Sequence, residues 1–375
     1  MIRKSLLLLT VAFLNACGEE DGTFAQYPGF AEYYTANPRS SEPPSAEDRE
    51  LLRRYRPRLF IGADQEGPIG FYADYIGHGT LTLGDGSKTD RVERTVLNAA
   101  SDDPRAEFDH DSPADAEPRP VAFARSDRFR TPLGQMQALS WYFTFRHSGL
   151  VADLPWWKEW PARILADADD WHELDHYTAF RLILKDGAPV AVWVQQHNFM
   201  RSWLIGEGAE MPADGRFRIT AALRSNELYP YREGRARHRA VSYPTSEHMR
   251  WLILGGDAPM MGGHDVTDPV REVDYAIEYP PPSDAFYSFQ GRLGEKRMIW
   301  PRSGPPGADY NTLPAIKPLW RQLVAGYWRE GNRGDAARVP VEGDHLSSSW
   351  FLAQQPVFRH NLTCLMGGRQ GCDLQ

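Results

Sequence analysis

The sequence predicts a mainly β protein, an antiparallel β-sandwich-like domain with long loops and a few short helices. Aromatic residues are abundant, with 12 Trp, 16 Tyr and 17 Phe in 375 residues, and aromatic side chains favour strands. The 32 Gly and 29 Pro recur at short intervals, as they do in turns between strands. Strand patterns are dense in the middle of the chain and helical patterns are few, which favours an antiparallel sandwich.

The N-terminus has the pattern of a bacterial lipoprotein signal peptide, predicted over residues 1–16. Two basic residues precede a short apolar run from Leu6 to Leu14, which is too short to span a bilayer. The sequence Leu14-Asn15-Ala16-Cys17 matches a lipobox, so Cys17 is the predicted lipidation site and membrane anchor. Because Asn15 is unusual in a lipobox, an ordinary cleaved secretory signal is the alternative.

The predicted location is the cell envelope. Gly18 follows Cys17, where an Asp often retains lipoproteins at the inner membrane, so an outer-membrane position facing the periplasm or the cell surface is favoured. Residues 17–45 are acidic and rich in Pro and Ser, which predicts a lipidated N-terminus and flexible tether. Residues 46–375 are expected to form a single β-sandwich-like domain with a C-terminal extension.

Local signals predict the elements of this domain in order. Ala46–Arg54 is a predicted helix with Ser45 as its N-cap, and a strand follows within Tyr55–Ile61. Residues 101–119 are acidic and are expected to form an exposed loop. Ala138–Arg146 is a predicted strand. The clearest unit is Tyr177–Gln196, where two β-rich runs flank the hairpin turn Lys185-Asp186-Gly187.

Weaker patterns predict the remaining elements. Further strands are expected at Phe217–Leu223, Ala240–Tyr243 and Val273–Glu278, and a helix at Leu319–Tyr327. A formal net charge of −8 and the absence of a basic run in the sequence argue against a nucleic-acid partner. A protein or glycan partner stays open.

The cysteines are consistent with export. An exported protein folds in an oxidising compartment, where disulfides persist. Cys17 would carry lipid, which leaves Cys364 and Cys372. These two lie close together in the sequence, so they are predicted to form a disulfide. Two free thiols are the alternative.

One segment, His172-Glu173-Leu174-Asp175-His176, matches the H-E-x-x-H pattern. On a helix, His172 and His176 would share one face and bind Zn²⁺, and Glu173 would act on the bound water. The following residues run directly into the hairpin, and Leu occupies position 182, where a third His ligand would be expected. A zinc-dependent hydrolase with Glu173 as its catalytic residue is therefore the alternative function.

If the same segment is a strand, it offers a different metal site. Asp170, Glu173 and Asp175 gather carboxylates near a junction between a loop and a strand, which suits Ca²⁺ or Mg²⁺. The hairpin would add His176 and His197 at the same edge of the sheet. A solvated acidic loop, or neutralisation by Arg146 or Arg201, is the alternative to a bound cation.

The same residues resemble the Vps62-related (DUF946-type) family. Asp169-Asp170-Trp171, His176-Tyr177-Thr178 and Val194–Asn198 with Trp203 are similar to its G-D-W-E-H-V-T strand and S-Q-H-x-x-G…W strand end. Tyr55–Ile61, Trp141–Phe145 and Arg239–His248 match further segments in the same order, over about residues 50–250. The resemblance implies a β-sandwich fold and no assigned reaction.

A looser similarity connects the chain to necrosis-inducing proteins, whose H-D-W-E motif binds a divalent cation on a β-sandwich. The chain differs from the motifs of both families. Three extra residues separate Trp171 from His176, so whether Glu173 or Asp175 replaces the family Glu is open, and the C-terminal third matches neither family. We therefore expect a membrane-anchored, non-enzymatic binding or interaction module with a divalent cation near Asp170 and Glu173. The metal-dependent hydrolase stays open as the alternative.

Overall fold

The hairpin predicted at Asp186-Gly187 lies within the largest sheet of the protein. In the computed structural model, β7 (Tyr177–Lys185) and β8 (Ala188–Gln196) pair antiparallel across this turn. Asp186 and Gly187 have φ angles of 51° and 80°, the two positive values that a type I′ hairpin turn requires. The hairpin prediction is confirmed.

The structure describes most of the chain between residues 40 and 294 and two C-terminal segments. The described residues are 40–63, 65–110, 119–146, 177–196, 199–207, 209–221, 226, 228–231, 270–294, 306–309, 349–366 and 373.

Within these residues, strands form three mixed sheets. The six-stranded sheet contains, in spatial order, β13 (Ala276–Glu278), β5 (Val121–Thr131), β6 (Gly134–Thr144), β7, β8 and β9 (Phe199–Leu204). A second sheet contains β11 (Leu228–Pro230), β10 (Arg218–Ala221), β1 (Arg58–Gly62) and β12 (Val270–Val273). A third contains β14 (Arg292–Leu293), β4 (Glu107–His110), β2 (Gly79–Thr82) and β3 (Lys88–Asp90).

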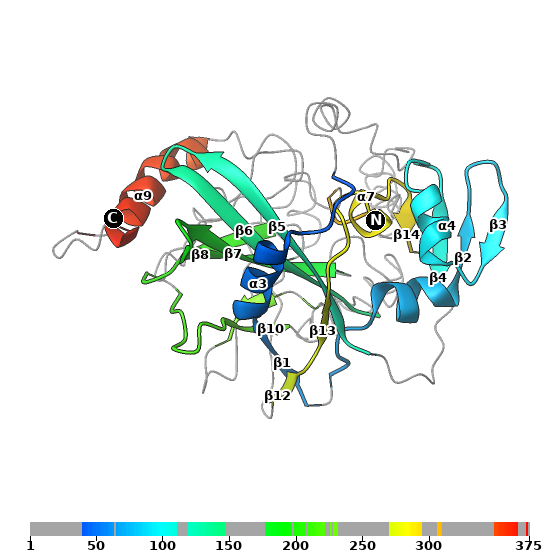
Figure 1. Ribbon diagram of the computed structural model, residues 1–375, viewed down its shortest axis with the longest axis horizontal. Helices are drawn as coiled ribbons and strands as arrows, with labels where there is room; N and C mark the ends of the chain where they lie inside the picture. The colour runs from blue at the N-terminus through cyan, green and yellow to red at the C-terminus, as the bar shows by residue number, and fades with distance from the viewer. Residues whose placement is uncertain are drawn as a thin grey trace, which may run out of the picture.

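Short helices connect and cover these sheets. They are α3 (Ala46–Arg54), the π-helix η2 (Phe71–Tyr75), the 3₁₀ turn η3 (Ile76–His78), α4 (Arg94–Ala99) and α7 (Ala285–Ser288), followed by the longer α9 (Ser349–Met366). Helix α3 packs on β5 and β6. Helix α9 and the third sheet lie at opposite ends of the molecule (Figure 1).

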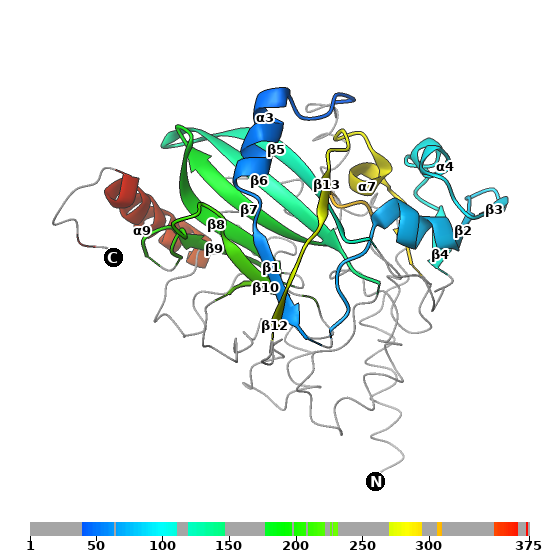
Figure 2. The same ribbon diagram turned by 60° about the horizontal axis from the view of Figure 1, so that its bottom comes forward.

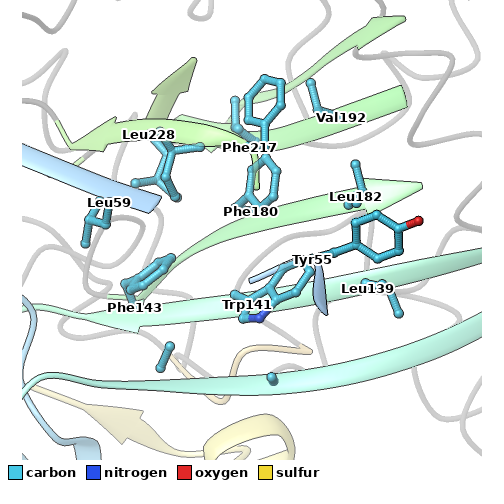
Figure 3. Packing of buried hydrophobic residues seen from close by; sticks show 14 of the residues in the cluster. Tyr55, Leu59, Leu139, Trp141, Phe143, Phe180, Leu182, Val192, Phe217 and Leu228 are labelled. Atoms are coloured by element: carbon cyan, nitrogen blue, oxygen red, sulfur yellow. The ribbon is translucent and has the colours of Figure 1, made fainter. Parts of the chain in front are cut away.

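A first core fills the space between the six-stranded sheet and the second sheet. Figure 2 shows β1 running across the six-stranded sheet. Alternate residues of β6 and β7 contribute Trp141, Phe143, Phe180 and Leu182, and Phe217 packs against Phe180 from the other side with ring centroids 5.4 Å apart (Figure 3). Burial of each such side chain contributes about 1.5–3 kcal/mol. We call this side of the six-stranded sheet its first face.

A second core forms on the opposite side of the sheet, its second face. Phe123 and Tyr142 of the sheet pack there against Phe286 of α7, with ring centroids 4.7 Å and 5.6 Å away. Phe71 of η2 and Phe108 of β4 join the same cluster. The sheet is thus buried on both faces here, so its second face is an interior surface.

The predicted fold class is confirmed: the protein is mainly β with few short helices. The arrangement differs in detail, because three strand pairs are parallel, β1 with β10, β13 with β5 and β14 with β4. Helix α3 begins and ends as predicted, and Ser45 accepts a hydrogen bond from the Asp48 backbone N–H. The strands predicted within Tyr55–Ile61 and Ala138–Arg146 are also present.

Two local predictions are wrong in part. The predicted loop at 101–119 contains β4, because Phe108 is fully buried and β4 pairs with β2. The predicted strand Val273–Glu278 divides between β12 and β13, which belong to different sheets. Buried Tyr275 lies between them, and its hydroxyl donates to the Pro57 carbonyl. The predicted strand Ala240–Tyr243 and helix Leu319–Tyr327 lie outside the described residues.

Candidate functional site

A row of polar side chains crosses the second face of the six-stranded sheet. Strand register places Arg125, Ser140, Arg181, Trp193 and Ser202 opposite one another on five successive strands. Directly opposed residues share a face of a sheet. All five are buried, with Ser140 and Ser202 at 0 % exposure and Arg181 at 8 %. We call these residues the polar row.

Local sequence explains why Arg181 is buried. It lies in the run Ala179-Phe180-Arg181-Leu182-Ile183, where apolar residues occupy both alternating positions. Phe180 and Leu182 enter the first core, which directs Arg181 to the second face. Because the second face is also covered, Arg181 is only 8 % exposed.

Arg181 uses part of its hydrogen-bonding capacity within the row. Its Nε donates to Ser140 Oγ at 3.1 Å, and its Nη2 donates to the Tyr142 hydroxyl at 2.9 Å. The guanidinium carbon lies 3.7 Å from the Trp193 ring centroid, a stacked arrangement that arginine favours. Its Nη1 has no hydrogen-bond partner, and no ion pair joins it to a carboxylate of the described residues.

Two neighbours of Arg181 also have buried polar groups without a hydrogen-bond partner in the described part of the chain. These groups are the Trp193 indole Nε1 and the Ser202 hydroxyl. Both lie in the same row as Arg181, on the next two strands. A buried polar group without a partner costs about 1–3 kcal/mol, so three adjacent ones need a physical explanation.

Arg125, at the other end of the row, is fully neutralised. Its Nε donates to Asp127 at 2.9 Å and its Nη1 donates to Asp309 at 2.8 Å. Burial lowers the pKa of Arg125, but these two carboxylates outweigh it and hold the pKa well above its ordinary value. Its guanidinium also lies 4.5 Å from the Tyr287 ring centroid. Arg125 is therefore a structural ion-pair centre.

The chemistry available near Arg181 is that of a hydrogen-bond donor set. Guanidinium Nη1 and indole Nε1 only donate, and the Ser202 hydroxyl can donate. Such a set complements a ligand that carries acceptor atoms. Ser202 Oγ donates no hydrogen bond to a base in the described residues, so no described group activates it as a nucleophile.

The structure does not describe most residues of the metal, lipid and disulfide sites predicted from the sequence. The residues outside its described part are Cys17, Asp170, His172, Glu173, Asp175, His176, His197 and Cys372. Pairing of Phe180 with Val194 puts the start of β7 and the end of β8 at one edge of the sheet. Among the described residues, no group of three His, Cys, Asp or Glu side chains has a metal-binding arrangement. The predicted cation site stays a prediction.

Cys364 is described and lies in α9. It is 7 % exposed, and its Sγ is 3.6 Å from Nε2 of His360, one turn earlier. The same His360 Nε2 donates to the Asp373 carbonyl at 2.8 Å. The residue that follows Cys372 thus lies beside the face of α9 that carries Cys364. Pairing of the two cysteines stays a prediction that this geometry favours.

The sequence-based prediction missed the polar row. One signal could have revealed it, because an arginine inside an apolar strand that is covered on both faces has to be buried. Its neighbours Trp193 and Ser202 gave no such signal, since both residue types are common in strands and their alignment depends on tertiary register.

The chain matches no protein-family model, no curated protein and no solved structure. The resemblance to the Vps62-related family therefore stays an expectation from motifs. None of the described helices is long and apolar enough to cross a membrane.

Proposed function

We propose that the protein is a lipid-anchored bacterial envelope protein whose β-rich body is a non-enzymatic binding module. One observation carries the binding function: Arg181 is buried and its Nη1 has no partner among the described residues, beside the donors of Trp193 and Ser202, which also have none there. A ligand with acceptor atoms would satisfy all three groups. The Vps62-like motifs, which belong to a family without an assigned reaction, support the same proposal.

The strand that begins at Tyr177 supports binding over zinc-dependent hydrolysis. A zinc site built from His172 and His176 needs a helix through both residues. Residues 177–185 form β7, so a helix would have to end directly after His176. We retain the divalent cation at Asp170, Glu173, Asp175, His176 and His197 as a part of the proposal.

The proposed anchor sets the distance from the membrane. Cys17 carries the lipid in this proposal, and α3 begins at Ala46. A flexible segment of that length has a root-mean-square span of about 30 Å. The binding module would therefore work close to the membrane, and an outer-membrane position is favoured by Gly18.

A panel of small molecules tests the binding function. The full chain is purified from membranes in detergent, and its melting is followed with neutral polar, anionic and cationic compounds. We expect at least one compound class to raise the melting temperature of wild type, and to raise that of Ser202→Ala less. A panel in which no compound shifts wild type contradicts the proposal. Hydrolytic turnover that Glu173→Gln abolishes would instead favour the zinc enzyme.

A further inference from the structure

We propose that the polar row binds a monoanionic carboxylate, with Arg181 as its counter-ion and Trp193 and Ser202 as further donors. This inference rests on the proposed function, because it names the ligand class of the same site.

The charge of Arg181 is the first argument. A guanidinium is always protonated in proteins, and Arg181 is 8 % exposed. Burial of a charge without a partner of opposite sign is strongly unfavourable. Arg125 shows how this fold satisfies a buried arginine that has a structural role, since two carboxylates contact it. Arg181 has no such partner among the described residues, so an anionic ligand is its natural complement.

The hydrogen bonds of Arg181 define how a ligand would approach. Ser140 and Tyr142 occupy Nε and Nη2, and Trp193 covers a face of the guanidinium. The edge at Nη1 is left for a ligand. Trp193 and Ser202 lie on successive strands, and neighbouring strands are about 4.8 Å apart. A planar carboxylate, with two oxygens that accept several hydrogen bonds, suits these few donors.

The neighbouring charges favour a monoanion over a dianion. Two carboxylates, Asp127 and Asp309, already lie beside Arg125. This cluster shares the second face with Arg181, two strands away. A carboxylate would neutralise Arg181, whereas a phosphate dianion would add a negative charge near the two aspartates. The row also offers fewer unpartnered donors than a phosphate has acceptor oxygens to satisfy.

Burial of the three donors has a kinetic consequence. Because Nη1 of Arg181, Nε1 of Trp193 and Oγ of Ser202 are enclosed, a ligand reaches them only when the local structure opens. Association is then slower than diffusion allows. Binding experiments therefore need incubation until the signal no longer changes.

Melting of the full-length protein with matched probes tests the inference. Acetate and benzoate are compared with their neutral amides, acetamide and benzamide, and with phosphate, all at constant ionic strength. We expect the carboxylates to raise the melting temperature of wild type with the logarithm of their concentration above Kd, by about 5 °C at 100 times Kd. The amides and phosphate are expected to leave it unchanged.

Variants connect this shift to Arg181. Arg181→Met removes the charge and is expected to abolish the carboxylate shift. Arg181→Lys keeps the charge but loses the planar fork and its stacking, so a reduced shift is expected. Lys88→Met, on the exposed strand β3, is the matched control for loss of a positive charge and should keep the full shift.

Other outcomes overturn the inference in distinct ways. Equal carboxylate shifts in wild type and Arg181→Met would mean that the anion acts elsewhere. A Ser202-dependent shift with amides or phosphate, and none with carboxylates, would leave the binding module intact but refute the carboxylate. The absence of any shift with every compound would refute both proposals.

Discussion

Asp48 shows how one carboxylate joins an N-terminal helix to a sheet. It lies in the first turn of α3 and is 5 % exposed. It accepts hydrogen bonds from Arg128 Nη2 at 2.9 Å and Gln137 Nε2 at 2.7 Å, both on the β5–β6 hairpin, and from Ser45 Oγ at 2.9 Å. Burial raises the pKa of Asp48, but the bonds from Arg128 and Ser45 outweigh it and hold the pKa below its ordinary 3.8.

The direction of this shift predicts a pH dependence. A pKa that is lower in the folded than in the unfolded state stabilises the protein above the unfolded value, and the stabilisation is lost as the pH falls through the folded value. We expect Asp48→Asn to lower the free energy of unfolding by about 1–3 kcal/mol at pH 7. The variant should also lose less stability than wild type below the ordinary pKa of 3.8.

Urea unfolding at neutral and acidic pH measures both effects. Glu47→Gln is the control, because Glu47 is the exposed neighbour in the same helical turn, and its effect should stay within about 0.5 kcal/mol. An Asp48→Asn protein that is as stable as wild type at pH 7 would show that the contacts of Asp48 contribute nothing.

At the scale of elements, local signals predicted those helices and strands whose stabilising contacts come from residues nearby in the sequence. The β7–β8 hairpin follows from its Asp-Gly turn, and α3 follows from its Ser45 cap. Strand β4 and helix α9 were missed for opposite reasons. In β4, acidic residues surround the single buried residue Phe108, so the sequence indicates a loop. In α9, Pro356 lies inside the helix, where proline is normally unfavourable. The polar row was missed because five separate strands create it.

The hairpin turn gives a prediction at this scale. Gly187 has a φ of 80° and open space around its missing Cβ, so a side chain there is disfavoured by backbone strain alone. We expect Gly187→Ala to lower the free energy of unfolding by about 1–2 kcal/mol. Gly67→Ala is the control, since its Cβ would meet its nearest atoms at an ordinary 3.7 Å and 3.8 Å. Chemical denaturation of both variants checks this, and equal stabilities would contradict the assigned turn.

The C-terminal end of α9 gives a second prediction at the scale of elements. The His360 bond to the Asp373 carbonyl favours a Cys364–Cys372 disulfide. Closure of so short a loop should stabilise the protein by about 2–3 kcal/mol in the chain-entropy description. Mass mapping without reductant is expected to find the two peptides joined. Recovery of both cysteines as alkylated thiols would refute the bond.

For the whole molecule, the sequence predicted the fold class but not the number of sheets or the parallel pairs, which depend on contacts between distant segments.

The lipid anchor at Cys17 is a prediction at this scale. We expect Cys17→Ser to release the protein from membranes or to leave it unprocessed, because in our proposal lipid at this residue supplies the attachment. Membrane fractionation checks this. A processed variant that fractionates with membranes as wild type does would exclude Cys17 as the anchor.

The cation proposal also concerns the whole protein, because its readout is global stability. We expect EDTA to lower the melting temperature of wild type, and added Ca²⁺ or Mg²⁺ to restore it, because bound metal stabilises only the folded state. The double variant Asp170→Ala, Glu173→Ala should lose this response. Melting of wild type that is indifferent to EDTA and to added Ca²⁺, Mg²⁺ and Zn²⁺ would leave the cluster as a solvated or ion-paired feature.

The position of β1 in its sheet has a consequence for how the protein is made. Its neighbours are β10 and β12, and Arg58 bonds Glu272 across 214 residues of sequence. Contacts of such long range form late, because the loop they close is costly in entropy. While the chain is still emerging from the ribosome, β1 has no completed sheet to join. In the export that we propose, β1 would stay without its sheet neighbours until the segment that contains β12 has crossed the membrane. The order of the strands would then help to keep the precursor competent for secretion.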